Sequence, residues 1–342
     1  MRALAQVPAS ADEPVPFDAL AAALERFHMV PAWAARYDTD TAVAAALLRT
    51  LPEHVAGLAA RGLPCRVDPV RGPLFERADL INVGLLSASE RTTLEMALRF
   101  LLAFTADPSG EWLDAKDWLV TVHLPEADSG RYRLRVPDFT APGIAVLPAD
   151  GLRLPPRGVE FDTRGHQAAV RITGAYHQVH DPQARDIYLQ MLDDLHARRV
   201  IYQCVAEPLR LNHQQAWQAG MADCIVVSRL ITDRLRAAGL TARARRGYLL
   251  GVTGTEHAWC ELFEDGRWKP IDVGLAFIPR RFPGGQDFPD TREFTDACFG
   301  SRLNRLLPCT GTDAASLIHD TLDDQPRAMF GLASGTLWKE TS

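Results

Sequence analysis

The stretch that decides the fold runs from Gly220 to Asp272 and reads GMADCIVVSRLITDRLRAAGLTARARRGYLLGVTGTEHAWCELFEDGRWKPID. After Asp223, apolar residues recur every three to four positions, which is the period of an amphipathic helix, and Gly239 is its expected end. Asp223 suits the N-cap position and places Cys224 in the first turn. Free backbone N–H groups and the helix dipole favour a thiolate there.

Two strands are expected after this helix, at 242–250 and 257–263, and Asp265-Gly266 then supplies the turn of a hairpin in which Glu264 faces Arg267. With those two turn residues, paired positions add up to 531, so that Trp259 faces Asp272 and His257 faces Gly274. Because side chains alternate along a strand, His257 and Asp272 share one side of the hairpin as diagonal neighbours, about 7 to 8 Å apart at most.

A carboxylate in that position accepts the imidazole N–H, fixes the tautomer and leaves the other ring nitrogen for the cysteine. The spacing therefore predicts a triad in which Cys224 is the nucleophile, His257 the base and Asp272 the residue that orients it. Each residue alone has a plainer interpretation: a buried inert thiol, a strand histidine with satisfied hydrogen bonds, and a carboxylate bound to a turn amide. The shared face favours the triad.

The ordered pattern around these residues resembles the core of the transglutaminase-like superfamily, whose fold is papain-like. Besides the triad, the matching positions are Leu235 to Arg243, Gly247-Tyr248, Trp259, Glu261, Gly266 with Trp268, Phe299-Gly300 and Asn304-Arg305. The resemblance covers roughly residues 183 to 310. Two positions depart from it, because Ala222 stands where glycine is often found and Val273 where proline is common.

The composition is that of a globular protein, with 342 residues, 47% hydrophobic and 23% charged. A formal net charge of -6 argues against a nucleic-acid partner. The first residues lack the apolar run of a secretory signal, and nothing approaches the roughly 18 apolar residues of a membrane span, so no membrane association is expected. The six cysteines form no CxxC pair, which favours reduced thiols and a cytoplasmic location.

The texture of the chain predicts an α+β protein in which the papain-like, transglutaminase-like core follows a helical and then a β-rich region. The expected boundaries are a helical N-terminal region at 1–114, a small β-rich region at 115–180, the catalytic core at 181–310 and a tail at 311–342.

Particular elements support these boundaries. Helices are expected over 17–29 and 41–61, interrupted near Pro31 and Pro52. A mostly irregular connection is expected over 62–86, and a capping box at Ser87–Glu90 is expected to start a helix through Phe104. Four β-rich segments follow, WLVTVHL, RYRLRV, VEFD and QAAVRITGAYH. Asp181-Pro182 predicts a helix start with an N-cap and a first-turn proline, and the tail is expected to form a short helix from Ala314 to Leu322.

An oxyanion hole should combine the backbone N–H of Cys224 with one upstream donor, for which Gln203, Trp217 and Tyr202 are the candidates. Trp259 shares the face of His257 and is expected to form a wall. No cofactor or metal is expected. The pair His177 and His180 lacks a third ligand, and no Asp-rich loop resembles a calcium site.

A basic run, Arg243, Arg245 and Arg246, favours a solvated strand face over a phosphate or carboxylate site.

The resemblance implies an acyl transfer in which Cys224 attacks an acyl donor, with His257 as general base and then general acid, through a thioester acyl-enzyme. The donor would be an activated acyl group, with an acyl or peptidyl carrier protein as candidate partner, and the acceptor an amine, giving an amide. A cysteine amidase or protease that uses water is the first alternative, and an inactive binding scaffold is the second. A third places the main function in the N-terminal half.

Overall fold

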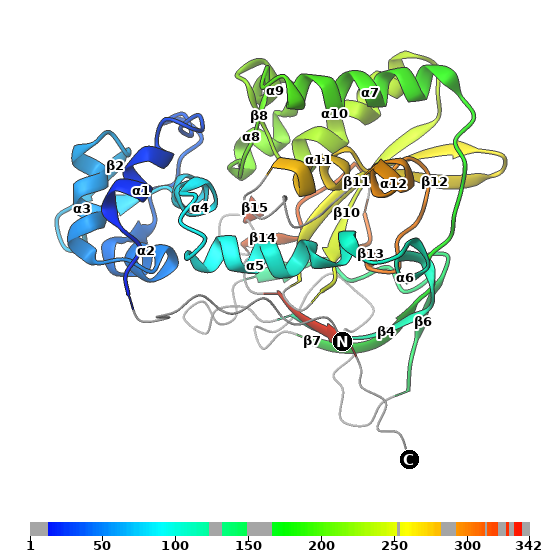
Figure 1. The fold of residues 1–342 in the computed structure, drawn as a ribbon, viewed down its shortest axis with the longest axis horizontal. Coiled ribbons are helices and arrows are strands. Elements are labelled where there is room, and N and C mark those ends of the chain that lie inside the picture. Colours follow the sequence, from blue (N-terminus) through cyan, green and yellow to red (C-terminus); the bar gives the residue numbers. More distant parts are fainter. Residues whose placement is uncertain are drawn as a thin grey trace. The chain divides into compact units, whose positions relative to one another are not determined.

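The computed structural model describes residues 13–122, 132–148, 166–251, 254–281, 292–311, 313–320, 326–327 and 332–336 (Figure 1). The chain divides into two compact units, Met1–Pro31 with Ala35–Met96 and Ala32–Ala34 with Ala97–Ser342. Helices and strands are mixed throughout, which confirms the α+β class.

In the first unit, helices surround a small antiparallel sheet of order β1-β3-β2. Its elements are α1 (Phe17–Ala23), β1 (Thr39–Asp40), α2 (Thr41–Leu48), α3 (Pro52–Ala60), β2 (Cys65–Asp68), β3 (Gly72–Phe75) and α4 (Arg77–Leu86). The helical stretch over 41–61 is interrupted near Pro52, as predicted, because Arg49 adopts the left-handed conformation and Pro52 starts the next helix at its first position.

The prediction that 62–86 is mostly irregular was wrong. The segment contains the β2–β3 hairpin and α4. Pro69 lies in the hairpin turn, and the Asp68 carboxylate accepts the backbone N–H groups of Val70 and Arg71 at 2.9 and 2.8 Å. The turn therefore accommodates Pro69 between the two strands.

Helix α5 (Thr93–Leu102) starts at a different capping box from the one predicted. Ala88 and Glu90 have positive φ angles of 55° and 59°, so Ser87–Glu90 lies outside the helix. Instead the Thr92 hydroxyl accepts the Glu95 N–H at 3.0 Å, and the Glu95 carboxylate accepts the Thr92 N–H at 3.2 Å. The sequence carries the same motif twice, and the second copy directly precedes the helix.

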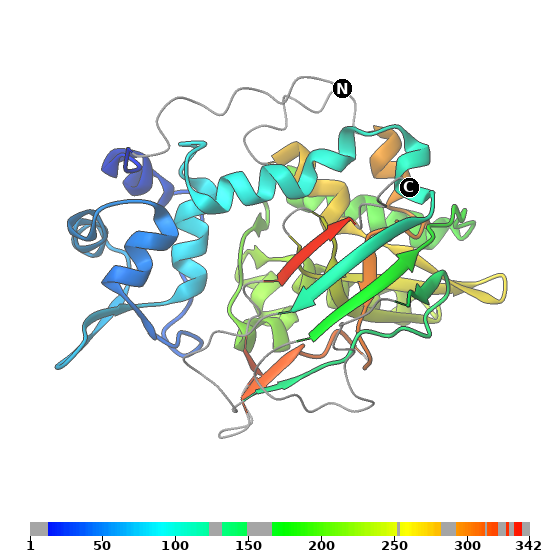
Figure 2. The same ribbon diagram turned by 90° about the horizontal axis from the view of Figure 1, so that it is seen from below.

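Two antiparallel four-stranded sheets organise the second unit (Figure 2). The first has the order β12-β11-β10-β13, with β10 (Ala242–Leu249), β11 (Thr255–Glu264), β12 (Arg267–Ile271) and β13 (Leu306–Pro308). The second has the order β16-β4-β7-β6, with β4 (Lys116–Val122), β6 (Ile144–Val146), β7 (His166–Ile172) and β16 (Leu332–Thr336). The strand expected at VEFD, 159–162, lies outside the described residues.

A third sheet, of order β15-β14-β5, joins the tail to the middle of the chain through β5 (Tyr132–Leu134), β14 (Ile318–Asp320) and β15 (Pro326–Arg327). The predicted tail helix, Ala314 to Leu322, was therefore wrong. Ile318 and Asp320 pair with Leu134 and Tyr132, so the pairing partners of this segment outweigh its weak helical pattern.

The helices of the second unit are η1 (Ala103–Ala106), α6 (Ser109–Leu113), α7 (Pro182–His196), α8 (Glu207–Leu211), α9 (His213–Gln218), α10 (Cys224–Ala237), α11 (Val273–Arg281) and α12 (Arg292–Ala297). Helix α7 begins as predicted, because the Asp181 carboxylate accepts the Ala184 N–H at 2.8 Å and Pro182 occupies the first turn. Helix α10 packs on β10 and β11 and contacts α7 and α11. Short strands β8 (Ile201–Tyr202) and β9 (Met221–Ala222) pair in parallel beside its start.

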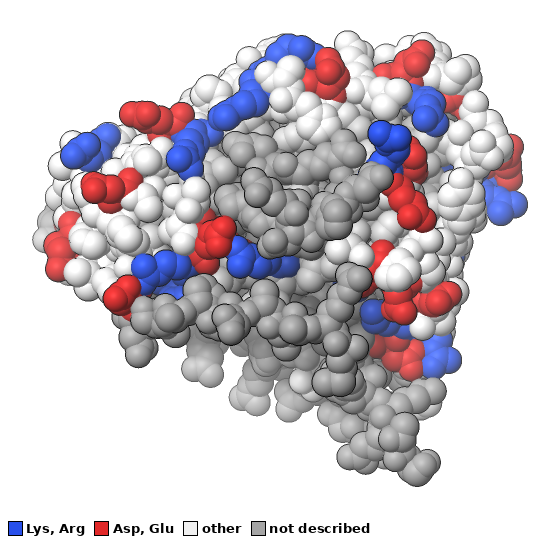
Figure 3. Space-filling view, viewed as in Figure 1, with Lys and Arg blue, Asp and Glu red and all other residues white. Residues whose placement is uncertain are grey.

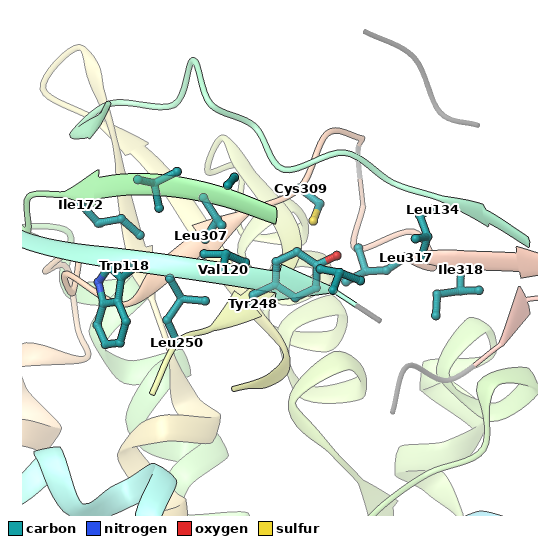
Figure 4. Packing of buried hydrophobic residues seen from close by; sticks show 13 residues of the cluster. Trp118, Val120, Leu134, Ile172, Tyr248, Leu250, Leu307, Cys309, Leu317 and Ile318 are labelled. Atoms are coloured by element: carbon teal, nitrogen blue, oxygen red, sulfur yellow. The ribbon is translucent and has the colours of Figure 1, made fainter. Parts of the chain in front are cut away.

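The apolar core of this unit lies between strands of the two large sheets (Figure 4). Trp118, Val120 and Ile172 from β4 and β7 cluster with Tyr248 and Leu307 from β10 and β13. At Gly247, an added Cβ would lie 2.2 Å from the Leu307 carbonyl oxygen, so only glycine allows β13 to approach β10 so closely.

The described surface carries both charge signs, and on the face in Figure 3 the acidic and basic side chains are interspersed. None of the described helices combines the length and the apolar character needed to cross a bilayer.

Candidate active site

Cys224 is the first residue of α10, as predicted. The N-cap is Asp223, whose Oδ1 accepts the backbone N–H groups of Ile225 and Val226, each at 3.0 Å. The helix ends before Gly239, which has a positive φ of 82°. The cysteine is partly exposed at a helix N-terminus, where unpaired backbone N–H groups stabilise negative charge.

The β11–β12 hairpin has the predicted register, from Glu264 opposite Arg267 to Cys260 opposite Ile271. Both turn residues have positive φ angles, 53° and 73°, as a two-residue hairpin turn requires. The ladder ends at Ile271 because α11 begins two residues later, so the expected extension to residues 272 and 274 does not form.

Asp272 therefore occupies the junction between strand and helix. Its backbone N–H donates to the Cys298 carbonyl at 2.9 Å, and its Oδ1 accepts the Leu275 N–H at 2.9 Å, which caps α11. The second carboxylate oxygen, Oδ2, lies 2.6 Å from Nε2 of His257, and both side chains are buried. Asp272 thus combines the plain role, a carboxylate bound to a turn amide, with the role expected in a triad.

The second ring nitrogen of His257 remains for a hydrogen bond with the Cys224 side chain. Burial lowers the pKa of His257, but the Asp272 carboxylate and the sulfur outweigh it and raise that pKa to about 10. His257 is therefore an imidazolium at neutral pH. The structure brings together the three residues that the sequence predicts.

A buried ionic network supports the start of α10 from behind. Arg210 donates to Asp223 at 2.7 Å, to Glu207 at 3.0 Å and to Glu256 at 3.5 Å. Arg246 donates to both oxygens of Glu207 at 2.7 and 2.9 Å and to Glu256 at 2.9 Å. Because Arg210 binds the Oδ2 of Asp223, it fixes the carboxylate whose other oxygen caps the nucleophile's helix.

The charges in this network are strongly coupled. Burial raises the pKa of Glu207, but Arg246 and Arg210 outweigh burial and lower it to about 2. Burial lowers the pKa of Arg210, yet its three carboxylate partners raise it overall. All five side chains are less than a tenth exposed, so each depends on the others for the hydrogen bonds that water would otherwise provide.

The basic run at 243–246 is neither an anion site nor a solvated face, because each arginine already has a carboxylate partner. Arg243 pairs with Glu261 at 2.6 Å and stacks on the ring of Trp268 at 3.9 Å. Arg245 pairs with Asp138 at 3.0 Å, and Arg246 belongs to the buried network. The opposite charges at diagonal positions 246 and 256 of the β10–β11 pair were a signal for this arrangement.

The structure separates the four weaker candidates. The Tyr202 hydroxyl hydrogen-bonds the Cys224 side chain. Gln203 is buried beside it, and its backbone N–H donates to the Ala222 carbonyl at 2.8 Å. Trp259 stacks on His257 with ring centroids 6.2 Å apart and donates to Glu261, which suits a wall. Trp217 instead receives the guanidinium of Arg234, ten residues or about 15 Å along α10 from the sulfur.

The remaining cysteines have different surroundings from Cys224. Cys260, Cys298 and Cys309 are buried, and burial raises the pKa of each. All six cysteines are free thiols. Of the predicted HxxH pair, His180 lies 3.8 Å from Asp265, and no group of three potential metal ligands occurs among the described residues.

A partly exposed cysteine at a helix N-terminus, paired with a strand imidazolium that a buried carboxylate orients, defines the class of papain-like thiol sites. Comparison with known families agrees. Residues 167–273 match the model of the transglutaminase-like superfamily, so this segment carries a transglutaminase-like core, which is a cysteine-dependent catalytic fold.

No curated protein sequence matches the chain. Among solved structures, the chain is similar to "a Putative Cysteine Protease from Cytophaga hutchinsonii", with 12% identity and a TM-score of 0.28 over 68% of this chain and 89% of the other.

Proposed function

We propose that the protein is a cysteine-dependent acyltransferase that forms an amide from an activated acyl donor and an amine through a thioester on Cys224. The observation that carries the proposal is the buried 2.6 Å contact between His257 and Asp272 beside a sulfur at a helix N-terminus. The free cysteines are compatible with a cytoplasmic location, which belongs to the same proposal.

The reaction begins from an ion pair, because the raised pKa of His257 keeps the imidazole protonated. The thiolate of Cys224 attacks the donor carbonyl, a C–S bond forms, and the carbonyl electron pair moves to oxygen. When the tetrahedral intermediate collapses, the bond to the leaving group breaks and His257 gives it a proton. His257 is then neutral and accepts a proton from the amine that attacks the thioester. Release of the amide restores the ion pair.

A thioester donor suits this site because a thiol leaves readily, and an acyl or peptidyl carrier protein is a natural source of such a donor. Oriented by Asp272, His257 serves both half-reactions without moving. Since water can replace the amine in the second half, transfer and hydrolysis use the same first half. Analysis of the product therefore distinguishes transfer from hydrolysis, whereas the geometry of the site does not.

The test uses an acyl thioester of N-acetylcysteamine as donor and an alkylamine as acceptor, with intact-protein and product mass spectrometry. We expect an acyl adduct on Cys224 and an amide product. The Cys224→Ala variant should lose both. The matched control is Cys204→Ala, which removes another partly buried thiol and should keep both.

Free acid as the product, with no amide at high amine concentration, would instead establish an amidase or protease. Absence of a Cys224 adduct, together with iodoacetamide labelling no faster than that of an ordinary thiol, would refute the enzyme and leave a binding scaffold.

A further inference from the structure

Tyr202 is held beside the nucleophile by backbone pairing. It lies in β8, which pairs in parallel with β9 so that Tyr202 is opposite Ala222, two residues before Cys224. The Gln203 N–H extends the pairing by donating to the Ala222 carbonyl at 2.8 Å. The tyrosine ring also packs on Phe277 of α11, with centroids 5.6 Å apart. Strand and helix contacts together fix the direction of the phenol.

The phenol hydroxyl, Cβ of Cys224 and the Asp272 carboxylate all lie close to Gly274. A Cβ added to this glycine would lie 3.1 Å from the Tyr202 hydroxyl, 3.4 Å from Cβ of Cys224 and 3.5 Å from Oδ1 of Asp272. Gly274 has no positive φ that would require glycine. The missing side chain therefore serves to leave room for the hydroxyl against the cysteine.

The Tyr202 hydroxyl keeps its proton to a higher pH than an ordinary tyrosine does. Tyr202 is buried, and burial together with the negative neighbours Cys224, Asp223 and Asp272 raises its pKa well above the usual value. The phenol keeps its proton and donates it to the sulfur. Trp217, a rival donor in the sequence, is directed to Arg234 at the other end of α10.

We propose that Tyr202 is a catalytic residue whose hydroxyl is the second donor of the oxyanion hole, and that Gly274 is kept without a side chain so that this hydroxyl reaches the reacting centre. The inference rests on the proposed acyl transfer. When the Cys224 sulfur forms its bond to the carbonyl carbon, negative charge leaves the sulfur and the carbonyl electron pair moves to the oxygen.

The hydroxyl then hydrogen-bonds this oxygen together with the backbone N–H of Cys224, and its proton stays on Tyr202 throughout. No oxidant or other reactant is needed. In the resting state the same hydroxyl donates to the sulfur, so the donor already lies beside the reacting centre.

The test compares two reactions of Cys224, acylation by p-nitrophenyl acetate and alkylation by iodoacetamide. Acylation passes through an oxyanion, whereas displacement at the saturated carbon of iodoacetamide does not. For Tyr202→Phe we expect acylation to fall about 10²- to 10³-fold, the usual effect of removing one oxyanion donor, while alkylation changes less than about threefold. Gly274→Ala, which crowds the hydroxyl, should likewise lower the ratio of the acylation rate to the alkylation rate.

The matched control is Tyr188→Phe, which removes a buried hydroxyl that donates to the Thr295 carbonyl at 2.9 Å and not to the sulfur. It should leave the ratio unchanged. If Tyr202→Phe loses acylation and alkylation equally, or loses neither, the inference about Tyr202 is overturned. Acylation of the wild-type protein would still support the proposed function in that case. If Tyr202→Phe does not fold, an unchanged ratio in Gly274→Ala overturns it. A wild-type protein that alkylates but never acylates would refute the proposed function first.

Discussion

Replacing Arg210 with methionine tests whether the ionic network behind Cys224 behaves as one closed unit. The substitution keeps a long apolar side chain but removes the cation that contacts Asp223, Glu207 and Glu256 at 2.7, 3.0 and 3.5 Å. Glu207 and Glu256 would then share the single guanidinium of Arg246, and Asp223 would lose the cation that it contacts. Removing one partner of a buried pair costs about 3 to 5 kcal/mol, because the remaining charges stay desolvated. We expect a loss of that size in the free energy of unfolding at pH 7.

The assay is urea denaturation of the full chain as a function of pH. The matched control is Arg199→Met, because Arg199 also bridges two carboxylates, Asp193 and Asp194, but is half exposed. A surface pair of this kind contributes about 0 to 1 kcal/mol. A loss in Arg210→Met no larger than that of Arg199→Met would refute the reasoning.

The pH dependence gives a second check with a definite sign. In the wild type, the pKa of Glu207 is lowered to about 2, so its ion pairs contribute stability that is present above pH 4.5 and is lost as the pH falls towards 2. Without Arg210 that lowering is diminished. The difference between wild type and variant should therefore shrink below about pH 4.5, because the carboxylates become protonated.

Two further predictions concern single carboxylates. In Asp272→Asn, loss of the carboxylate removes the strongest influence that raises the pKa of His257, so the basic limb of Cys224 acylation should move to lower pH and the rate at pH 8 should fall by about 10²-fold; an unchanged pH–rate profile would contradict this. In the first unit, burial raises the pKa of Asp79 to about 7, so the free energy of unfolding of the wild type should fall as the pH rises from 4 to 7. Urea denaturation should show the Asp79→Asn variant gaining up to about 4 kcal/mol relative to the wild type across that range. Parallel curves of stability against pH for the two proteins would contradict this.

The helix and hairpin that carry the triad were predictable because their signals are local. A cap residue, an apolar period and a two-residue turn lie within the stretch itself, and they set the register from Glu264 to Cys260 without reference to the rest of the chain. The sequence did not predict where the β11–β12 pairing ends, because this depends on α11, which starts at Val273 and competes with continued pairing.

The sequence could not predict the ionic network behind Cys224, nor favour Tyr202 over the other oxyanion candidates. Both depend on contacts between side chains from separate elements. Arg210 and Asp223 are thirteen residues apart and meet only after α8 folds against α10. The strand in the tail was not predicted for a similar reason, since Ile318 becomes a strand residue only when Leu134 is beside it. Capping motifs present in two copies, at Ser87 and Thr92, show that a local signal can also be ambiguous.

The family match ends at Val273, yet the sheet that carries His257 is completed well beyond it. Strand β13 covers the free edge of β10, and the Cys298 carbonyl anchors the backbone of Asp272. Excision of 167–273, as in a domain transplant, would uncover a hydrogen-bonding edge next to Tyr248 and detach the acid from its support. Any attempt to move this chemistry into another scaffold must therefore carry the later segments as part of the functional unit.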